Sequence, residues 1–239
     1  EITGMSTAPT YAGAIQVNFP ANNCSVSNNY IHDLAEGHGG VTFESKGVIP
    51  ESDGANNCSI KNNTMQRTGD VMVALHGTGH IIENNIFRDG AIWEDVFRLT
   101  GSANIIIRNN LILNHRSDKG HADIFQIFSD NGEQTHDILF ERNFVDGNDT
   151  QMFQMTNTKN VHPVGNITFK NNVFTNTQLG STIGIDNISF INNTFIHDSL
   201  YYATHPLVFG SDYNPGVMLL GGRVVNNVFI GNGGNGSNP

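Results

Sequence analysis

The chain has 239 residues, which is long enough for one or two globular domains with a substantial core. Its 12 Lys and Arg stand against 22 Asp and Glu, and the resulting net charge of −10 argues against a general nucleic-acid binder, because phosphate recognition needs a basic surface. No apolar stretch approaches the roughly 18 residues of a membrane span, and no signal peptide opens the chain, so we expect no membrane insertion.

One template, apolar-x-apolar-x-Asn-Asn-x-apolar, recurs eight times along the chain. In one copy Arg142 replaces the first Asn. The intervals between copies range from 21 to 34 residues, so the shortest mark a bare coil and the longer ones carry inserted loops. The second Asn of each copy falls at Asn29, Asn63, Asn85, Asn110, Asn143, Asn172, Asn193 and Asn227.

Apolar residues alternate with polar ones on both sides of each Asn pair, which predicts two short strands that meet at a bend. A repeat of about 22 residues is too short for a crossover helix, so the strands must coil. The pattern therefore predicts an all-β fold, a right-handed single-stranded parallel β-helix of about eight coils over residues 1–230, with a flexible Gly/Asn-rich tail at 231–239. Stacked Asn side chains, about 4.8 Å apart, are expected to form a hydrogen-bonded ladder.

A further strand is expected after each bend, at residues 40–44, 72–76, 96–100, 124–128 and 152–156. In this register one inward row consists of Val41, Val73, Phe97, Phe125 and Phe153. The matching outward row consists of Thr42, Ala74, Arg98, Gln126 and Gln154. Because inserted loops flank these strands, the outward row is predicted to be the floor of a groove that suits an extended polymer.

Functional side chains concentrate around this row. The groups suited to proton transfer or to neutralising a carboxylate are His121, Asp123, Arg98 and Lys119. The groups expected to hydrogen-bond a sugar polymer are Gln126, Gln154, His76, Arg116 and Glu44. A structural alternative is that Asp123 only caps a turn and that the Gln row only stabilises the sheet.

No cofactor is required by these patterns. Asp95 and Asp123 lie on adjacent predicted coils and are the candidate ligands for a Ca²⁺ ion, which takes six to eight oxygen ligands. Cys24 and Cys58 occupy matching positions in two copies of the repeat. Two buried, unbonded thiols are the favoured interpretation, and a disulfide between neighbouring coils is the alternative.

The Asn-Asn coils resemble the right-handed β-helix superfamily typified by pectate lyases, and the stretch 121–126 with 135–143 is similar to uncharacterised bacterial and phage-associated β-helix proteins. The resemblance covers essentially the whole chain. The Asp-Pro-His motif of epimerases with this fold is absent, as are the calcium-binding nonapeptide arrays. The resemblance therefore implies fold more strongly than function.

Three functions follow as hypotheses. The first is a polysaccharide lyase or related depolymerase that acts on an extended, uronate-containing glycan outside a cell. The second is a non-catalytic glycan-binding adhesin or phage tailspike segment on a virion surface, with a larger parent chain or a homotrimer covering the solenoid ends. The third is a structural spacer, whose groove side chains would not converge.

Overall fold

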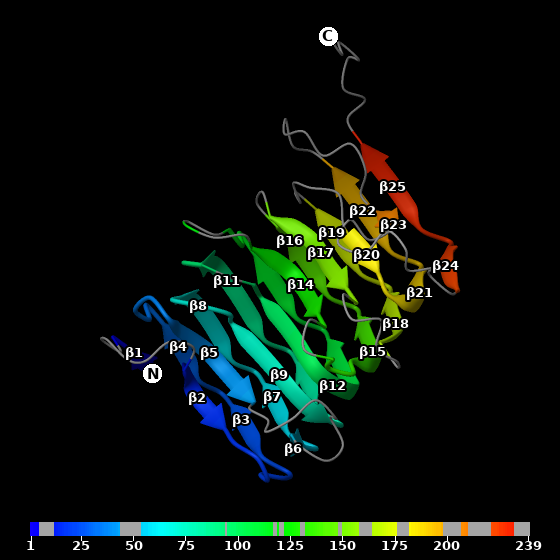
Figure 1. The fold of residues 1–239 in the computed structure, drawn as a ribbon. Helices are drawn as coiled ribbons and strands as arrows, with labels where there is room; N and C mark the ends of the chain where they lie inside the picture. The colour runs from blue at the N-terminus through cyan, green and yellow to red at the C-terminus, as the bar shows by residue number, and fades with distance from the viewer. Residues whose placement is uncertain are drawn as a thin grey trace.

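The computed structural model describes residues 1–4, 12–43, 54–93, 95–116, 119, 122–129, 132–147, 150–157, 164–175, 182–197, 207–209 and 221–231. Within these ranges the chain is all-β, and its strands form long parallel sheets that compose a solenoid-like stack (Figure 1). The parallel all-β architecture predicted from the repeat is therefore confirmed. Within the same ranges, no helix has the length and hydropathy needed to cross a membrane.

The first sheet contains the strand that follows each Asn pair. Its nine strands, in spatial order, are β1 (Ile2–Thr3), β4 (Tyr30–His32), β8 (Thr64–Thr68), β11 (Ile86–Ala91), β13 (Leu111–Leu113), β16 (Phe144–Asp146), β19 (Val173–Thr175), β22 (Thr194–His197) and β25 (Val228–Gly231). Spatial order follows chain order because each turn of the solenoid adds one strand to the growing edge.

The second sheet has two rows of strands, joined through the long strand β12 (Phe97–Arg108). The row that carries the predicted groove contains β2 (Ala12–Val17), β5 (His38–Phe43), β9 (Val73–Thr78), the first part of β12, β14 (Asp123–Phe128), β17 (Gln151–Thr156), β20 (Thr182–Gly184) and β23 (Val208–Phe209). We call it the groove row. The register of β12 against β9 shifts between Leu99 and Ser102, where Gly101 has a φ of 55° and lets the strand turn.

The other row, which leads into the Asn pairs, is called the entry row. It contains β3 (Ser25–Ser27), β7 (Ser59–Lys61), β10 (Ile81–Glu83), the last part of β12, β15 (His136–Glu141), β18 (Gly165–Lys170), β21 (Asp186–Ile191) and β24 (Gly222–Val225). The short strand β6 (Ala55–Asn56) pairs with the end of β9, at the turn between the two rows.

The Asn pairs stack into one column, which we call the asparagine corner. The first residue of each pair has a φ between 53° and 59°, a conformation that Asn tolerates better than most residues. The second Asn of each pair donates its amide to the carboxamide oxygen of the Asn in the next coil, at 2.9–3.2 Å, from Asn29 through to Asn227. The predicted ladder is confirmed along its whole length.

Aromatic side chains fill the core between the sheets. Phe97, Phe125 and Phe153 occupy equivalent positions on the groove row and are fully buried, as the predicted register requires. They meet Phe140 and Phe169 from the entry row, with ring centroids 4.6–6.0 Å apart. Edge-to-face contacts of this kind add to the hydrophobic stabilisation of the stack.

A second polar column lies five residues after the first position of each of the first four Asn pairs, where the first sheet turns toward the groove row. Its members also have positive φ, between 46° and 59°, and are Asp33, Arg67, Asp89 and Asn114. We call this column the charged corner. It separates the first sheet from the strands of the groove row, so every coil in this region passes it before reaching the predicted groove.

Candidate functional site

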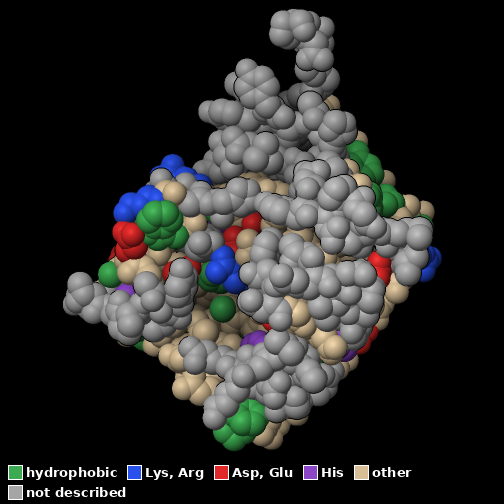
Figure 2. All heavy atoms as spheres, in the orientation of Figure 1, with side chains coloured by type: hydrophobic (Ala, Val, Ile, Leu, Met, Phe, Trp, Pro, Cys, Tyr) green, Lys and Arg blue, Asp and Glu red, His purple; other side chains and the backbone are tan. Residues whose placement is uncertain are grey.

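The outward row predicted for the groove exists. Thr42 pairs with Ala74, Ala74 with Arg98, Arg98 with Gln126, and Gln126 with Gln154. The backbone register continues from Thr42 to Gln16 on one side and from Gln154 to Thr182 on the other. Figure 2 shows that this face is hollowed over β9, β12 and β14, and that basic, acidic and His side chains come to the surface there.

Arg98 is the basic residue of the outward row, and neighbouring side chains hold its guanidinium in place. Its Nη2 lies 2.9 Å from Oδ2 of Asp95, and its Nε donates to Oε1 of Gln126 at 2.8 Å. The Arg98 side chain is 27% exposed, whereas the Asp95 side chain is fully buried. The buried carboxylate and the Gln126 amide oxygen therefore hold the guanidinium in a defined orientation, and part of the side chain is exposed to solvent.

The carboxylates of the two aspartates proposed to bind calcium, Asp95 and Asp123, accept hydrogen bonds from nearby backbone and side-chain groups. Oδ1 of Asp95 accepts the backbone N–H of Asp123 at 2.9 Å, and Oδ2 of Asp123 accepts the amide of Gln126 at 3.2 Å. Both residues are fully buried. Within the part of the chain that the structure describes, no group of three or more His, Cys, Asp or Glu side chains is arranged to hold a metal ion.

His76 and Gln154 are close to the row but largely covered. His76 is 6% exposed, and its ring packs beneath Gly101, where a Cβ atom would come within 2.3 Å of the His76 Cε1. Gln154 is 7% exposed and its side-chain oxygen accepts the amide of Gln151 at 3.3 Å. Both residues therefore support the floor of the groove more than they line its surface.

Lys119 and Arg116 lie toward the charged corner. The Lys119 Nζ is 2.7 Å from Oε2 of Glu36 and 5.5 Å from the centroid of the Trp93 ring. Its backbone N–H donates to the carbonyl of Ile92 at 3.1 Å, which fixes this residue beside the turn that leads into β12. His121 and Glu44, the other two predicted site residues, lie outside the described residues.

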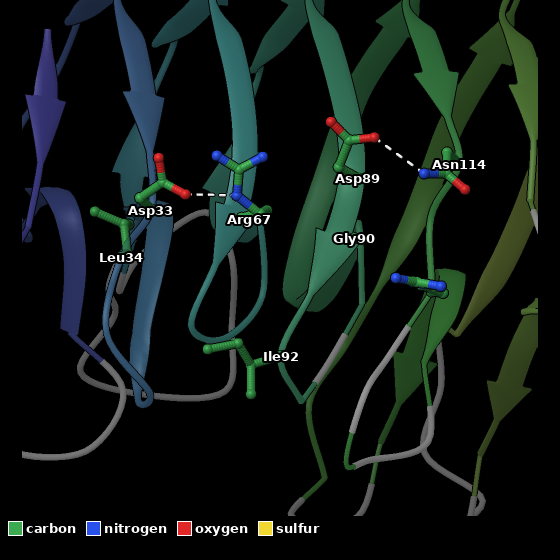
Figure 3. A pocket seen from close by; sticks show the side chains of 8 residues that line it. Asp33, Leu34, Arg67, Asp89, Gly90, Ile92 and Asn114 are labelled. Atoms are coloured by element: carbon green, nitrogen blue, oxygen red, sulfur yellow. Dashed lines mark hydrogen bonds and ion pairs between the residues drawn. The ribbon is translucent and has the colours of Figure 1, made fainter.

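A cleft of about 690 Å³ opens at the charged corner (Figure 3). Arg67 reaches back to Asp33, with its Nε 2.5 Å from Oδ1, and Asn114 donates to Asp89 at 3.0 Å. Figure 3 shows these four side chains side by side across neighbouring coils. The remaining lining is apolar or basic and consists of Leu34, Gly90, Ile92 and Arg116.

Ion pairing sets the charge state of this corner. The hydrogen bond from Arg67, aided by His32, lowers the pKa of Asp33 from 3.8 to about 2. The hydrogen bond that His32 donates to the Asp33 carboxylate raises the pKa of His32 in turn. The hydrogen bond from Lys119 likewise lowers the pKa of Glu36. The cleft thus holds ionised acidic and basic groups together, and their opposite charges largely balance.

The charged corner was not predicted as a site, although the sequence contains a usable signal. Asp33, Arg67, Asp89 and Asn114 each follow the first residue of their Asn pair by five positions. A polar residue at a constant offset in consecutive repeats must form a column in a solenoid. Aligning the repeats for charge as well as for apolar residues would have revealed it.

Comparisons of the chain with protein-family models, with curated protein sequences and with solved structures found no match. The geometry of the groove row and of the charged corner is therefore the basis on which a function can be proposed.

Proposed function

We propose that this protein is a right-handed parallel β-helix of about eight coils, related to the pectate-lyase-like superfamily, that binds an extended, uronate-containing polysaccharide outside a cell or on a virion surface. The glycan would run across the groove row, so that successive sugars meet successive coils. Parallel strands place equivalent side chains about 4.8 Å apart, which gives a long polymer a regular series of contacts.

The observation that carries the proposal is the orientation of Arg98. A buried carboxylate from Asp95 and the amide oxygen of Gln126 fix its guanidinium on a partly exposed face. A fixed guanidinium loses little conformational entropy when it binds a planar carboxylate, and charge-assisted hydrogen bonds are the strongest polar contacts available there. Gln126 then supplies a neighbouring polar side chain for sugar hydroxyls.

The cleft at the charged corner borders the groove row on the side from which the strands enter. Ile92 lines the cleft, and three residues later Asp95 anchors Arg98. Carboxylates, an amide and guanidinium groups beside apolar Leu34 and Ile92 can bind the hydroxyls and the apolar face of one sugar. This cleft would give the groove a specific subsite for a neutral residue or branch, since its charges balance.

Cleavage is a second candidate, favoured by the presence of paired cation and carboxylate groups at the row. In a lyase mechanism Arg98 would neutralise the uronate carboxylate, and His121 or Lys119 would take the proton from the adjacent carbon. A carbon–carbon double bond would form as the bond to the leaving oxygen breaks, and that oxygen would take a proton from solvent. In the structure the Lys119 ammonium is ion-paired with Glu36, and a charged ammonium cannot accept a proton. His121 is therefore the main candidate for the base.

The test is native gel electrophoresis in the presence of soluble polysaccharides, with polygalacturonate and alginate as acidic polymers and dextran as a neutral one. The acidic polymers should retard the wild-type protein, and Arg98→Lys should weaken the retardation about tenfold or more, because Lys lacks the guanidinium fork. Arg108→Ala is the matched control. Arg108 is 34% exposed and paired with Glu83 on the entry row, away from the groove.

Equal retardation of the wild-type protein and Arg98→Lys by polygalacturonate and alginate would contradict the proposal, as would equal loss in Arg108→Ala. Circular dichroism of each variant checks that the fold is intact. Incubation with the same polymers tests cleavage separately. Unsaturated uronate products or new reducing ends that depend on His121 support an enzyme, whereas retardation without products supports a binding protein.

A further inference from the structure

The two cysteines of the chain lie on neighbouring coils at one end of the described stack. Cys24 directly precedes β3 and Cys58 directly precedes β7, and these strands pair in register from Ser25 with Ser59 onward. The backbone N–H of Ser59 donates to the carbonyl of Cys24 at 2.8 Å, so the register extends to the cysteines themselves. The sequence contains no other cysteine that could compete for either thiol.

We infer that Cys24 and Cys58 close a disulfide that cross-links β3 to β7 when the protein meets an oxidising small-molecule disulfide. Equivalent residues on neighbouring parallel strands have Cα atoms about 4.8 Å apart, within the range of about 4.4–6.8 Å found in disulfides. The Cys58 sulfur lies close to Cys24, because the backbone N–H of Cys24 donates to Sγ of Cys58 at 3.3 Å, and the Cys24 side chain itself interacts with the Cys58 thiol. In the structure both residues are present as free thiols.

The difference in burial between the thiols sets the order of the reaction. Cys24 is half-buried and Cys58 is 1% exposed, so the external disulfide can reach Cys24 first. The Cys24 thiolate displaces one thiolate from the reagent and forms a mixed disulfide. The Cys58 thiolate then attacks the Cys24 sulfur and releases the second thiolate, so two protein thiols are oxidised and one reagent disulfide is reduced to two thiols.

The second step should be slow at neutral pH and should accelerate with pH. Burial raises the pKa of the Cys58 thiol to about 11. Only a small fraction is therefore thiolate near neutrality, and that fraction grows on the order of tenfold per pH unit up to the pKa.

The cross-link would stabilise an end of the solenoid. Among the described strands, β3 pairs with β7 on one side only, whereas β7 pairs with strands on both sides. Terminal units of a repeat stack have fewer neighbours and open most easily. A covalent bond across 34 residues of chain would hold β3 in place by restricting the unfolded ensemble.

The experiment treats the reduced full-length chain with oxidised glutathione over a series of pH values. Free thiols are counted under denaturing conditions, the intact mass is measured, and thermal unfolding of the products is followed. The wild-type protein should lose both thiols and two hydrogen atoms in mass, and its unfolding midpoint should rise by about 5–10 °C. Cys24→Ala should lose no thiol pair and show no such rise, and Cys58→Ala should stop at the glutathione adduct on Cys24.

A wild-type adduct that persists on Cys24 at alkaline pH would overturn the inference, because it would show that Cys58 cannot reach the mixed disulfide. A covalent dimer would also overturn it. An intramolecular disulfide that leaves the unfolding midpoint unchanged would confirm the cross-link and overturn its stabilisation of the end of the solenoid. None of these outcomes depends on glycan binding, so the inference and the proposed function fail or stand separately.

Discussion

The asparagine corner and the charged corner have the same backbone conformation, but their side chains differ in burial and in the partners they bind. Each corner places a residue with positive φ in successive coils. At the asparagine corner the second Asn is nearly fully buried, for example 1% exposed at Asn85 and 2% at Asn110. At the charged corner the side chains of Asp33 and Arg67 are 44% and 49% exposed.

The burial of a corner determines whether every coil must have the same residue there. A buried polar group must find its partner in the next coil, and Asn satisfies this at every level because its amide both donates and accepts. An exposed corner can bond to water, so acids, bases and amides all fit there. The charged corner can therefore vary from coil to coil and form a ligand cleft, whereas the asparagine corner maintains the stack.

The largest expected effect is at the centre of the ladder. Asn110→Ala removes the acceptor for both the backbone N–H and the side-chain amide of Asn85, and it removes the donors to Ile82 and Asn143. Because these partners are buried, their loss should lower the free energy of unfolding by about 4 kcal/mol. Urea denaturation followed by circular dichroism measures the change.

The matched control for this variant is Asn114→Gly at the charged corner. It removes the exposed hydrogen bond to Asp89, and Gly keeps the positive φ of 52° without strain. We expect a loss below about 1 kcal/mol. Similar losses in the two variants would show that the corners do not differ in the way proposed.

A smaller effect of opposite sign is expected at Arg142, the one non-Asn residue at the first position of the pairs. Its φ is 53°, a conformation in which Asn is favoured over Arg. Arg142→Asn should raise the free energy of unfolding by about 0.5–1 kcal/mol, less whatever the exposed contacts to Glu141 and Asn109 contribute. A clear loss of stability would mean that this corner is set by side-chain pairing more than by backbone conformation.

The smallest effect on stability, and the clearest electrostatic one, is expected from Arg67→Asn. Asn tolerates the φ of 46° but cannot hold an ion pair, so the pKa of Asp33 should rise from about 2 toward 3.8. Because the folded-state pKa is lowered, the wild-type pair contributes stability above about pH 4 and loses it as pH falls through 2. The contribution should be under 1 kcal/mol, since both groups are exposed.

Nuclear magnetic resonance titration of the Asp33 carboxyl carbon in both proteins measures this shift. An unchanged pKa in Arg67→Asn would show that Arg67 does not hold the carboxylate in solution. The charged corner would then be a set of independent solvated side chains, and its role as an organised cleft would lose its support.

The sequence alone determined the parallel stack, the asparagine ladder and the inward Phe97–Phe125–Phe153 row, because a strict local repeat places equivalent residues one strand apart. It also placed Arg98 beside Gln126. The same register could not show that Asp95 and Asp123 are fully buried, or that His76 packs beneath Gly101.

Lys119 is the clearest example of a side-chain position that the sequence repeat does not predict, since its partner Glu36 lies 83 residues away in the sequence. Lys119 lies in an inserted segment, and no repeat period governs where such a segment folds. Its side chain is placed by a distant charge and by Trp93, so only the tertiary structure decides its position. The conformation of the repeats is determined by their local sequence. The conformation of the inserted segments depends on contacts with the folded repeats, which the local sequence does not predict.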